Sequence, residues 1–479
     1  MNIYPRRAIF RRHQDPNIYR MFLWILLILG GIWIIRQIQQ GAIEPILLAT
    51  PTPTRLAVSY AQEAEAKFTA GEVNGAILAY LEAVQVDPSD AKAWADLARI
   101  QTYSTALLTT DPERKARLDE ALDSINQAVA LAPDSSYVHA IRAFVLDWNA
   151  NPSLLDAKQV QAYLTEAEQE AVRALQLDNS NTIALAYYAE ILVDQQKWTQ
   201  GDQYIKQALQ QDATLMDVHR VHAYVLESLG QYNLAIDAYD KAISIAPNMT
   251  FLYLRAGANY RRLAFESPNE QVQRDLYEKS LEYFAKTAQI NAQLGVEDPV
   301  PYLSISRTYS QMGEFFIAAR NVQKALEFQP YNADIYGQLG VIYFKSRNYE
   351  GSIPALKCAV RGCTAEESCD GRGGCGPNDE PSEVVGLELS PNTVVYYYTY
   401  GSVLAALSRP QDNQCGEALD VLADVKAAFG EDRDIAGIVT AGEQICSSLA
   451  EGIAFSAETP VPGATEAGMI ETATPTLTP

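Results

Sequence analysis

Residues 336–359 read YGQLGVIYFKSRNYEGSIPALKCA, and the pattern of this stretch decides the fold. Apolar and small residues recur at helical spacing, first as Y-x2-L-G-x2-Y from Tyr336 and then, after a short polar break, from Tyr349. This period predicts two amphipathic helices joined by a tight turn. Gly340 falls where the two helices would touch, and a residue without a side chain permits that close approach.

The same pattern recurs along the chain. The spacings between successive closing segments are 45, 46, 34, 34, 45 and 38 residues. These segments end at Pro88, Pro133, Asn179, Ala213, Pro247, Ala292 and Pro330. Because 34 residues is the tetratricopeptide period, the chain resembles a tetratricopeptide-repeat array over roughly residues 56–450.

This resemblance implies an all-α fold, a right-handed α-solenoid of about nine helix-turn-helix units with a capping helix near residues 434–446. Three spacings exceed the period by 11 or 12 residues, and in these insertions Pro follows Asp111, Asn151 or Ser267. Such dipeptides are typical of helix starts. We therefore predict that the second helix of units 2, 3 and 6 is longer by about three turns at its N-terminus.

The N-terminal segment has the composition of a membrane anchor. Residues 21–35 carry no charge, and we predict a transmembrane helix over 21–38, with Arg20 and Arg36 reaching the two interfaces. A cleaved signal peptide is the alternative, but no small-residue cleavage site follows closely, which favours an uncleaved signal-anchor. The basic segment 1–20 would be cytoplasmic and the array extracytoplasmic. The Thr/Pro-rich stretches 39–55 and 451–479 are predicted to be a linker and a disordered tail.

The charge of the chain is unevenly spread. Its 479 residues include 37 Lys+Arg and 59 Asp+Glu, for a formal net charge of −22. Six Arg and one Asp give the first 40 residues +5, which leaves −27 on the remainder. An acidic body lacks the basic face that a nucleic-acid binder needs, so we expect no nucleic-acid partner.

The six cysteines all lie in the last quarter of the chain. They are Cys358, Cys363, Cys369, Cys375, Cys415 and Cys446. The first four belong to an insertion at 358–390, and their spacing lacks the paired CxxC of zinc sites. An even number outside the cytoplasm favours disulfides, with Cys415 and Cys446 placed to join the last helices. A metal site and free thiols are the alternatives.

Signals of catalysis are close to absent from the sequence. It contains none of the motifs GxSxG, HExxH, GxxxxGK[ST] or GxGxxG. His219 and His222 have a spacing that could chelate a metal ion, but their places in the repeat favour packing against a neighbouring helix. We therefore expect no enzyme activity, no metal and no cofactor.

In the family that the chain resembles, the first helices of the units line a groove that binds proteins or peptides. Carried onto this sequence, units 4 and 5 would place four acids and one Arg there, whereas units 6 to 8 would place four bases and one acid. The candidate groove residues are Tyr224, Phe251, Leu254, Arg261, Arg262, Arg307, Phe344 and Lys345. Because Arg suits bidentate capture of carboxylates, we predict an acidic partner. The alternative is that these bases pair with neighbouring acids.

Together these features predict a membrane-anchored, extracytoplasmic scaffold that mediates protein–protein interaction in a cell-envelope or secretory assembly. Two alternatives remain open at this point. One is an accessory or substrate-delivery subunit of an envelope enzyme, and the other is a solute- or peptide-binding receptor.

Overall fold

The computed structural model describes residues 17–39, 55–108, 110–376 and 379–451. The predicted cytoplasmic segment (1–20), linker (39–55) and tail (451–479) lie almost entirely outside these residues. The chain divides into two compact units, Met1–Leu56 and Ala57–Pro479, and each is described by itself.

The described residues of the first unit form one helix, α1 (Ile18–Gln39). Its large apolar side chains are exposed along its length, among them Leu23, Leu26 and Trp33. The side chains at positions 34, 35, 38 and 39 are outside the described set. Among the described residues, no helix is both long enough and apolar enough to cross a membrane.

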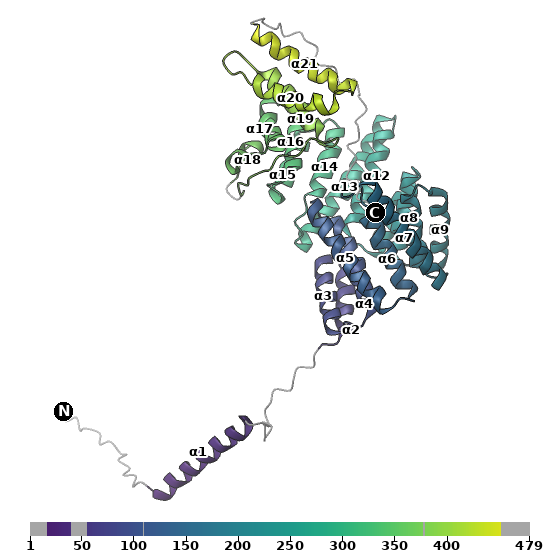
Figure 1. The fold of residues 1–479 in the computed structure, drawn as a ribbon, viewed down its shortest axis with the longest axis vertical. Coiled ribbons are helices and arrows are strands. Elements are labelled where there is room, and N and C mark those ends of the chain that lie inside the picture. Colours follow the sequence, from purple (N-terminus) through teal and green to yellow (C-terminus); the bar gives the residue numbers. More distant parts are fainter. Residues whose placement is uncertain (1–16, 40–54, 109, 377–378, 452–479) are drawn as a thin grey trace, which may run out of the picture. The chain divides into compact units, whose positions relative to one another are not determined.

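The second unit is a succession of nine antiparallel helix pairs, in which each pair packs against the next (Figure 1). The first helices are α2 (Ala57–Thr69), α4 (Ala91–Ser104), α6 (Ser136–Asn149), α8 (Thr182–Asp194), α10 (Met216–Ser228), α12 (Thr250–Glu266), α14 (Val300–Gln311), α16 (Ala333–Lys345) and α19 (Val394–Leu407). The second helices are α3 (Val73–Val86), α5 (Asp111–Leu131), α7 (Ala157–Leu177), α9 (Trp198–Gln211), α11 (Tyr232–Ile245), α13 (Glu270–Leu294), α15 (Phe315–Phe328), α17 (Tyr349–Val360) and α20 (Cys415–Phe429).

Three further helices complete the described part of this unit: η1 (Thr105–Leu107), α18 (Ala365–Gly371) and α21 (Arg433–Ala450). Apart from two isolated bridges, all regular structure in the described residues is helical, which confirms the all-α prediction. The last helix, α21, packs against α19 and α20 and buries Ile435 and Val439 there. The terminal apolar face is thereby covered, as a solenoid requires.

In five of the described pairs, the turn between the two helices contains one residue with a left-handed backbone. Glycine supplies it at Gly71, Gly230 and Gly313, with φ of 84°, 70° and 80°. Gln196 and Arg347 take the equivalent place in two other units, with φ of 62° and 64°. A residue with a side chain disfavours the left-handed conformation. At Gln196 and Arg347 the packing of the two helices must therefore stabilise a turn that the local sequence does not favour.

Small residues allow the helices of a pair to approach closely. A Cβ atom at Gly340 would lie 2.5 Å from Leu356 Cγ, and one at Gly257 would lie 2.7 Å from Phe284 Cε1. Both distances are too short for real carbon contacts. The close approach that the sequence predicted at Gly340 is therefore present.

The second helices of units 2, 3 and 6 are longer than the others, as predicted, but only α13 gains the predicted length of about three turns, and α5 and α7 gain about two. The three helices contain 21, 21 and 25 residues, against 14 in α3, α9, α11 and α15. The predicted starting residues were wrong. The capping side chains belong to Thr110, Asp156 and Asn269 rather than to Asp111, Asn151 and Ser267. In α7 the reason is a capping box that Asp156 forms with Gln159, which satisfies two otherwise free amides at once.

Candidate functional site

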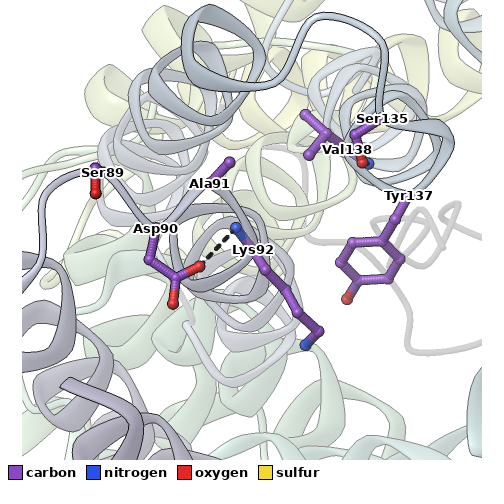
Figure 2. A pocket seen from close by; sticks show the side chains of 7 residues that line it. All are labelled: Ser89, Asp90, Ala91, Lys92, Ser135, Tyr137 and Val138. Carbon is purple, nitrogen blue, oxygen red and sulfur yellow. Dashed lines mark hydrogen bonds between the residues drawn. The ribbon is translucent and has the colours of Figure 1, made fainter. Parts of the chain in front are cut away.

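One pocket, of about 420 Å³, lies where the N-terminal ends of α4 and α6 meet. Figure 2 shows Lys92 and Tyr137 at its lining, one from each helix. Both already have partners, because Lys92 Nζ forms a 2.6 Å ion pair with Asp96 and the Tyr137 hydroxyl donates to the same carboxylate at 2.5 Å. Asp90 caps α4 by accepting from the amide of Lys92 (Figure 2). The polar groups here serve the fold, and we do not assign the site to this pocket.

A more extensive polar cluster lies between the first helices of units 2 to 5. We call it the inner network, and its members are Arg99, Tyr103, Tyr187, Glu190, Asp217 and Arg220. All are buried except Arg99, whose side chain keeps 13% of its exposure. Because a buried charge is costly unless it is paired and hydrogen-bonded, the partners of these groups decide whether the cluster stabilises the fold.

Asp217 is the acceptor at one end of the inner network. Its carboxylate pairs with Arg99 at 2.6 Å and accepts from the hydroxyls of Tyr103 at 2.5 Å and Tyr187 at 2.6 Å. Burial alone would raise the pKa of Asp217, but the guanidinium and the two hydroxyls outweigh it and hold this pKa well below its ordinary value. Asp217 is therefore a permanent, fully satisfied anion.

Arg220 and Glu190 form the second ion pair of the inner network. The guanidinium meets the carboxylate in bidentate fashion at 2.6 and 2.5 Å, and Glu190 has no exposed surface. Arg220 Nε also donates to the Tyr103 hydroxyl at 3.0 Å, and its guanidinium lies 5.8 Å from the Trp148 ring. Tyr103 thus links the two ion pairs into one connected network.

Contacts between units that are distant in sequence connect the beginning of the array to units 5 and 6. We call units 1 to 6 the closed part. Arg99 and Asp217 are 118 residues apart in sequence, so their ion pair joins α4 to α10. Tyr103 stacks on Phe251 of α12, with ring centroids 5.5 Å apart, and Asn248 Nδ2 donates to the carbonyl of Ala70 at 2.9 Å. The space that the sequence assigned to a groove in units 4 and 5 is consequently filled by the protein's own side chains.

Three of the predicted groove residues lie in or beside this closed part. Phe251 and Leu254 on α12 are 7% and 4% exposed, so they are core residues that present little surface to a partner. Tyr224 on α10 is half-buried and donates a hydrogen bond to Asp194. Its hydroxyl already has an acceptor inside the protein.

Two other predicted groove residues contact neighbours in their own units. Arg262 forms a 2.8 Å ion pair with Glu266, four residues ahead on α12. Phe344 packs against Tyr349 of α17, with ring centroids 5.6 Å apart. For Arg262 the structure matches the alternative interpretation, in which the base pairs with a nearby acid.

The first helix of unit 7 is covered much less than those of units 2 to 5. α4 and α6 bury most of their residues, whereas α14 buries only Pro301, Ser306 and Thr308. Arg307 and most other side chains of α14 are half-exposed. We call these α14 side chains, together with Arg261 of α12 and Lys345 of α16, the open face.

Arg261 is the basic residue of the open face that contacts α14 directly. Arg261 Nη1 donates to the carbonyl of Ser304 on α14 at 3.4 Å, which places its guanidinium beside that helix. Lys345 is exposed, yet the protein around it lowers the pKa of its ammonium group by desolvation.

A buried pair of acids lies beside the inner network. Asp147 on α6 is 2% exposed, and neither of its carboxylate oxygens receives a hydrogen bond from a protein donor. It faces Asp194, and burial together with the neighbouring Asp194 and Glu190 charges raises the pKa of Asp147 well above its ordinary value. Burial also raises the pKa of Asp194, to about 7. The pair therefore shares a proton near neutrality.

The six cysteines form three disulfides. Cys358 pairs with Cys363, Cys369 with Cys375 and Cys415 with Cys446, at Cα–Cα distances of 4.7, 4.9 and 5.5 Å. Within the described residues, no three His, Cys, Asp or Glu side chains gather closely enough to hold a metal ion. His219 instead contacts the Ala213 carbonyl through Nε2 at 2.9 Å.

Sequence reasoning missed Arg99, Tyr103 and Tyr187. Their common partner, Asp217, was assigned to the groove of units 4 and 5 as an acid that a ligand would meet. The sequence around them carries no clear signal of these contacts, because Arg99 and Asp217 are 118 residues apart.

Comparison with known proteins identifies the repeat. A family profile described as "Tetratricopeptide repeat" matches residues 221–249, which cover most of α10 and all of α11. This match supports a tetratricopeptide-repeat protein, as the sequence pattern indicated. No curated protein matches the chain.

Three solved structures show likeness to this chain. A thermophilic TPR protein of Thermus thermophilus is 17% identical with a TM-score of 0.35, over 42% of this chain and 98% of that chain. MamA is 20% identical with a TM-score of 0.30, over 36% and 93% of the two chains. The human IFIT1 dimer with PPP-AAAA is 15% identical with a TM-score of 0.49, over 83% and 92%.

Breaking the Arg220–Glu190 pair should destabilise the array strongly. Arg220→Met leaves a buried, unpaired carboxylate, and we expect the free energy of unfolding to fall by about 3–5 kcal/mol. Arg220→Met/Glu190→Leu removes both charges and should recover much of that loss. The control is Arg262→Ala, which breaks an exposed pair and should cost less than about 1 kcal/mol. Urea unfolding followed by circular dichroism measures all three, and a double variant no more stable than the single one would contradict the prediction.

The Asp147–Asp194 pair should make stability depend on pH. Both carboxyls have a higher pKa in the folded chain than in the unfolded chain, so their contribution is fully present below about pH 4 and is lost as the pH rises through about 7. Asp147→Asn removes the repulsion, and we expect this variant to be more stable than the wild type by about 1–3 kcal/mol at pH 8 and by much less at pH 5. Asp237→Asn, at an exposed acid of α11, is the matched control and should show no such trend. Parallel pH profiles for Asp147→Asn and the wild type would rule the shared proton out.

Proposed function

We propose that this tetratricopeptide-repeat protein is a membrane-anchored, extracytoplasmic scaffold whose open face binds an acidic segment of a partner protein. The contrast between the two halves of the array carries the proposal. In units 2 to 5 the first helices cover one another and the inner network pairs Arg99 and Arg220 with acids, whereas α14 keeps most of its side chains half-exposed. In arrays of this kind the first helices form the surface that meets a partner, and α14 is where that surface remains accessible.

The charge of the open face supports an acidic partner. Arg261, Arg307 and Lys345 are basic, while the chain as a whole carries a net charge of −22. An acidic peptide would be repelled by most of this protein and attracted at the open face. Such a contrast increases the association rate and the specificity more than the final affinity. Asp334 on α16 accepts a hydrogen bond from the Tyr396 hydroxyl at 2.7 Å. This bond partly offsets the negative charge of Asp334 near the open face.

The composition of α1 supports the membrane anchor. Residues 21–35 contain no charge, and the described apolar side chains of α1 are exposed on every side. A helix that is apolar all round is stable only when it is covered by protein or by lipid. The excess of Arg before this segment favours a cytoplasmic N-terminus. The three disulfides of the array suit an oxidising compartment outside the cytoplasm.

Binding to the open face can be tested with a matched pair of peptides. We expect a Glu-rich peptide of about 15 residues to bind the full chain more tightly than the same peptide with Gln in place of Glu, and the difference to shrink as salt is added. Lys345→Glu should weaken binding of the Glu-rich peptide about tenfold. Lys206→Glu makes the same charge change on the exposed surface of α9 and should leave affinity within about twofold. Equal affinity for the two peptides, measured by fluorescence anisotropy, would end the proposal.

Anchoring by α1 can be tested separately. Leu26→Arg/Leu27→Arg places two charges at the centre of the helix, at a cost of about 2.5–3.5 kcal/mol each in a bilayer. We expect this variant to move from the membrane fraction to the soluble fraction after cell lysis. Gln37→Arg adds a charge at the end of the helix and should remain with membranes. If the double variant stays membrane-bound, the anchor is elsewhere, and the binding test above is unaffected.

A further inference from the structure

The three disulfides differ in their surroundings. Those of Cys358 with Cys363 and of Cys415 with Cys446 are buried. Cys369 and Cys375 are half-buried, and they lie at the surface of the insertion between α17 and α19. Of the three, the Cys369–Cys375 bond is therefore the one that a reductant in solution can reach.

A buried guanidinium lies against this bond. Arg372 is 6% exposed, and its Nη2 donates to Cys375 Sγ at 3.1 Å and to the Glu380 carbonyl at 3.0 Å. The same nitrogen reaches Cys369 Sγ at 3.9 Å and Ser368 Oγ at 3.4 Å, and Nε reaches the Ser368 carbonyl at 3.4 Å. Within the described residues no carboxylate forms an ion pair with it. A buried cation held only by neutral acceptors gains most from a new anion beside it.

The nearest acids do not replace that anion. Asp379 directs its carboxylate to the amide of Gly376 at 2.6 Å, and Glu367 pairs with Lys357 at 2.6 Å. Asp370 is exposed on α18. The charge in direct contact with Cys375 Sγ is thus the positive charge of Arg372.

We infer that Cys369–Cys375 is a redox-active disulfide, in which Arg372 stabilises the Cys375 thiolate when a dithiol reductant opens the bond. A thiolate of the reductant attacks Cys369 Sγ and forms a mixed disulfide. The Cys369–Cys375 bond breaks, and its electron pair leaves on Cys375 Sγ. The second thiol of the reductant then attacks the mixed disulfide and releases Cys369, which takes up a proton. Two electrons pass from the dithiol to the protein, and the reductant leaves as a disulfide.

The chemistry of leaving groups explains why this bond, among the three, would react. Exchange is faster when the departing sulfur forms a more stable thiolate. A neighbouring Arg lowers the pKa of a thiol and so stabilises that thiolate. The loop that carries this bond is joined to the array, because Gln323 Nε2 of α15 donates to the Arg372 carbonyl at 2.7 Å and to the Tyr343 hydroxyl of α16 at 3.0 Å.

The order of reduction tests the inference in the wild-type protein. The full chain is treated with dithiothreitol at about pH 7, quenched with acid at intervals and alkylated, and each cysteine is quantified by mass spectrometry. We expect Cys369 and Cys375 to become reactive together, at least about tenfold sooner than the other four. With only that pair reduced, iodoacetamide at about pH 6.5 should modify Cys375 about tenfold faster than Cys369, because more of it is thiolate. Simultaneous reduction of all three disulfides, or equal rates at Cys369 and Cys375, would overturn the inference.

Variants at position 372 test the role of the guanidinium. Arg372→Gln should lower the rate of Cys375 alkylation to that of Cys369, and Arg372→Lys, which keeps the charge, should retain most of the difference. Lys357→Gln removes a cation of α17 that forms an exposed ion pair with Glu367 of the insertion, and it should change neither rate. An Arg372→Gln protein with an unchanged Cys375 rate would exclude Arg372 as the stabilising group. If that variant does not fold, the wild-type measurements still decide the inference.

Discussion

The second unit depends on the pairing of buried charges between distant first helices. Arg99 with Asp217 and Arg220 with Glu190 are joined through the Tyr103 hydroxyl. Burying any one of these charges alone would cost several kcal/mol, whereas the complete set is satisfied. These ion pairs and hydrogen bonds can all form in only one arrangement. The network therefore fixes the position of α10 relative to α4. Apolar packing between alanine-rich helices would tolerate small changes of that angle, and the charged network does not.

This closure makes the first helices of one part of the array less accessible than α14. An array whose first helices are held apart leaves a continuous surface along its inner side. Here the aromatic side chains of Tyr103 and Phe251 stack where units 2 and 6 meet, and ligand access ends there. The half-exposed side chains of α14 lie beyond this closed part in sequence. In the function that we propose, the interactions that stabilise one half of the array leave recognition to the other half.

The sequence predicted the local features well, because each depends on residues close together in the chain. The helical period around Tyr336, the close contact at Gly340 and the lengthened α5, α7 and α13 follow from spacing alone. Closure could not be predicted in this way, since Arg99 and Asp217 are 118 residues apart and only the curvature of the array brings them together. Phe251 and Leu254 were assigned to the groove because the family pattern places them there, although their apolar side chains are equally typical of a core. The role of the basic residues and the anchoring by α1 stay predictions.

The disulfides illustrate how the same bond serves different ends. Cys415 and Cys446 are separated by 31 residues, and closing a loop of that length stabilises a fold by roughly 3–4 kcal/mol in the chain-entropy account. That bond holds the capping helix α21 to α20. Cys369 and Cys375 are only 6 residues apart, so the same account gives roughly 2 kcal/mol. A short-range bond restricts the unfolded chain least, and the fold can most easily tolerate its opening. Arg372 lies against the short-range bond, which adds less stability to the fold. The place of Arg372 there fits a role in the thiol–disulfide exchange that we infer.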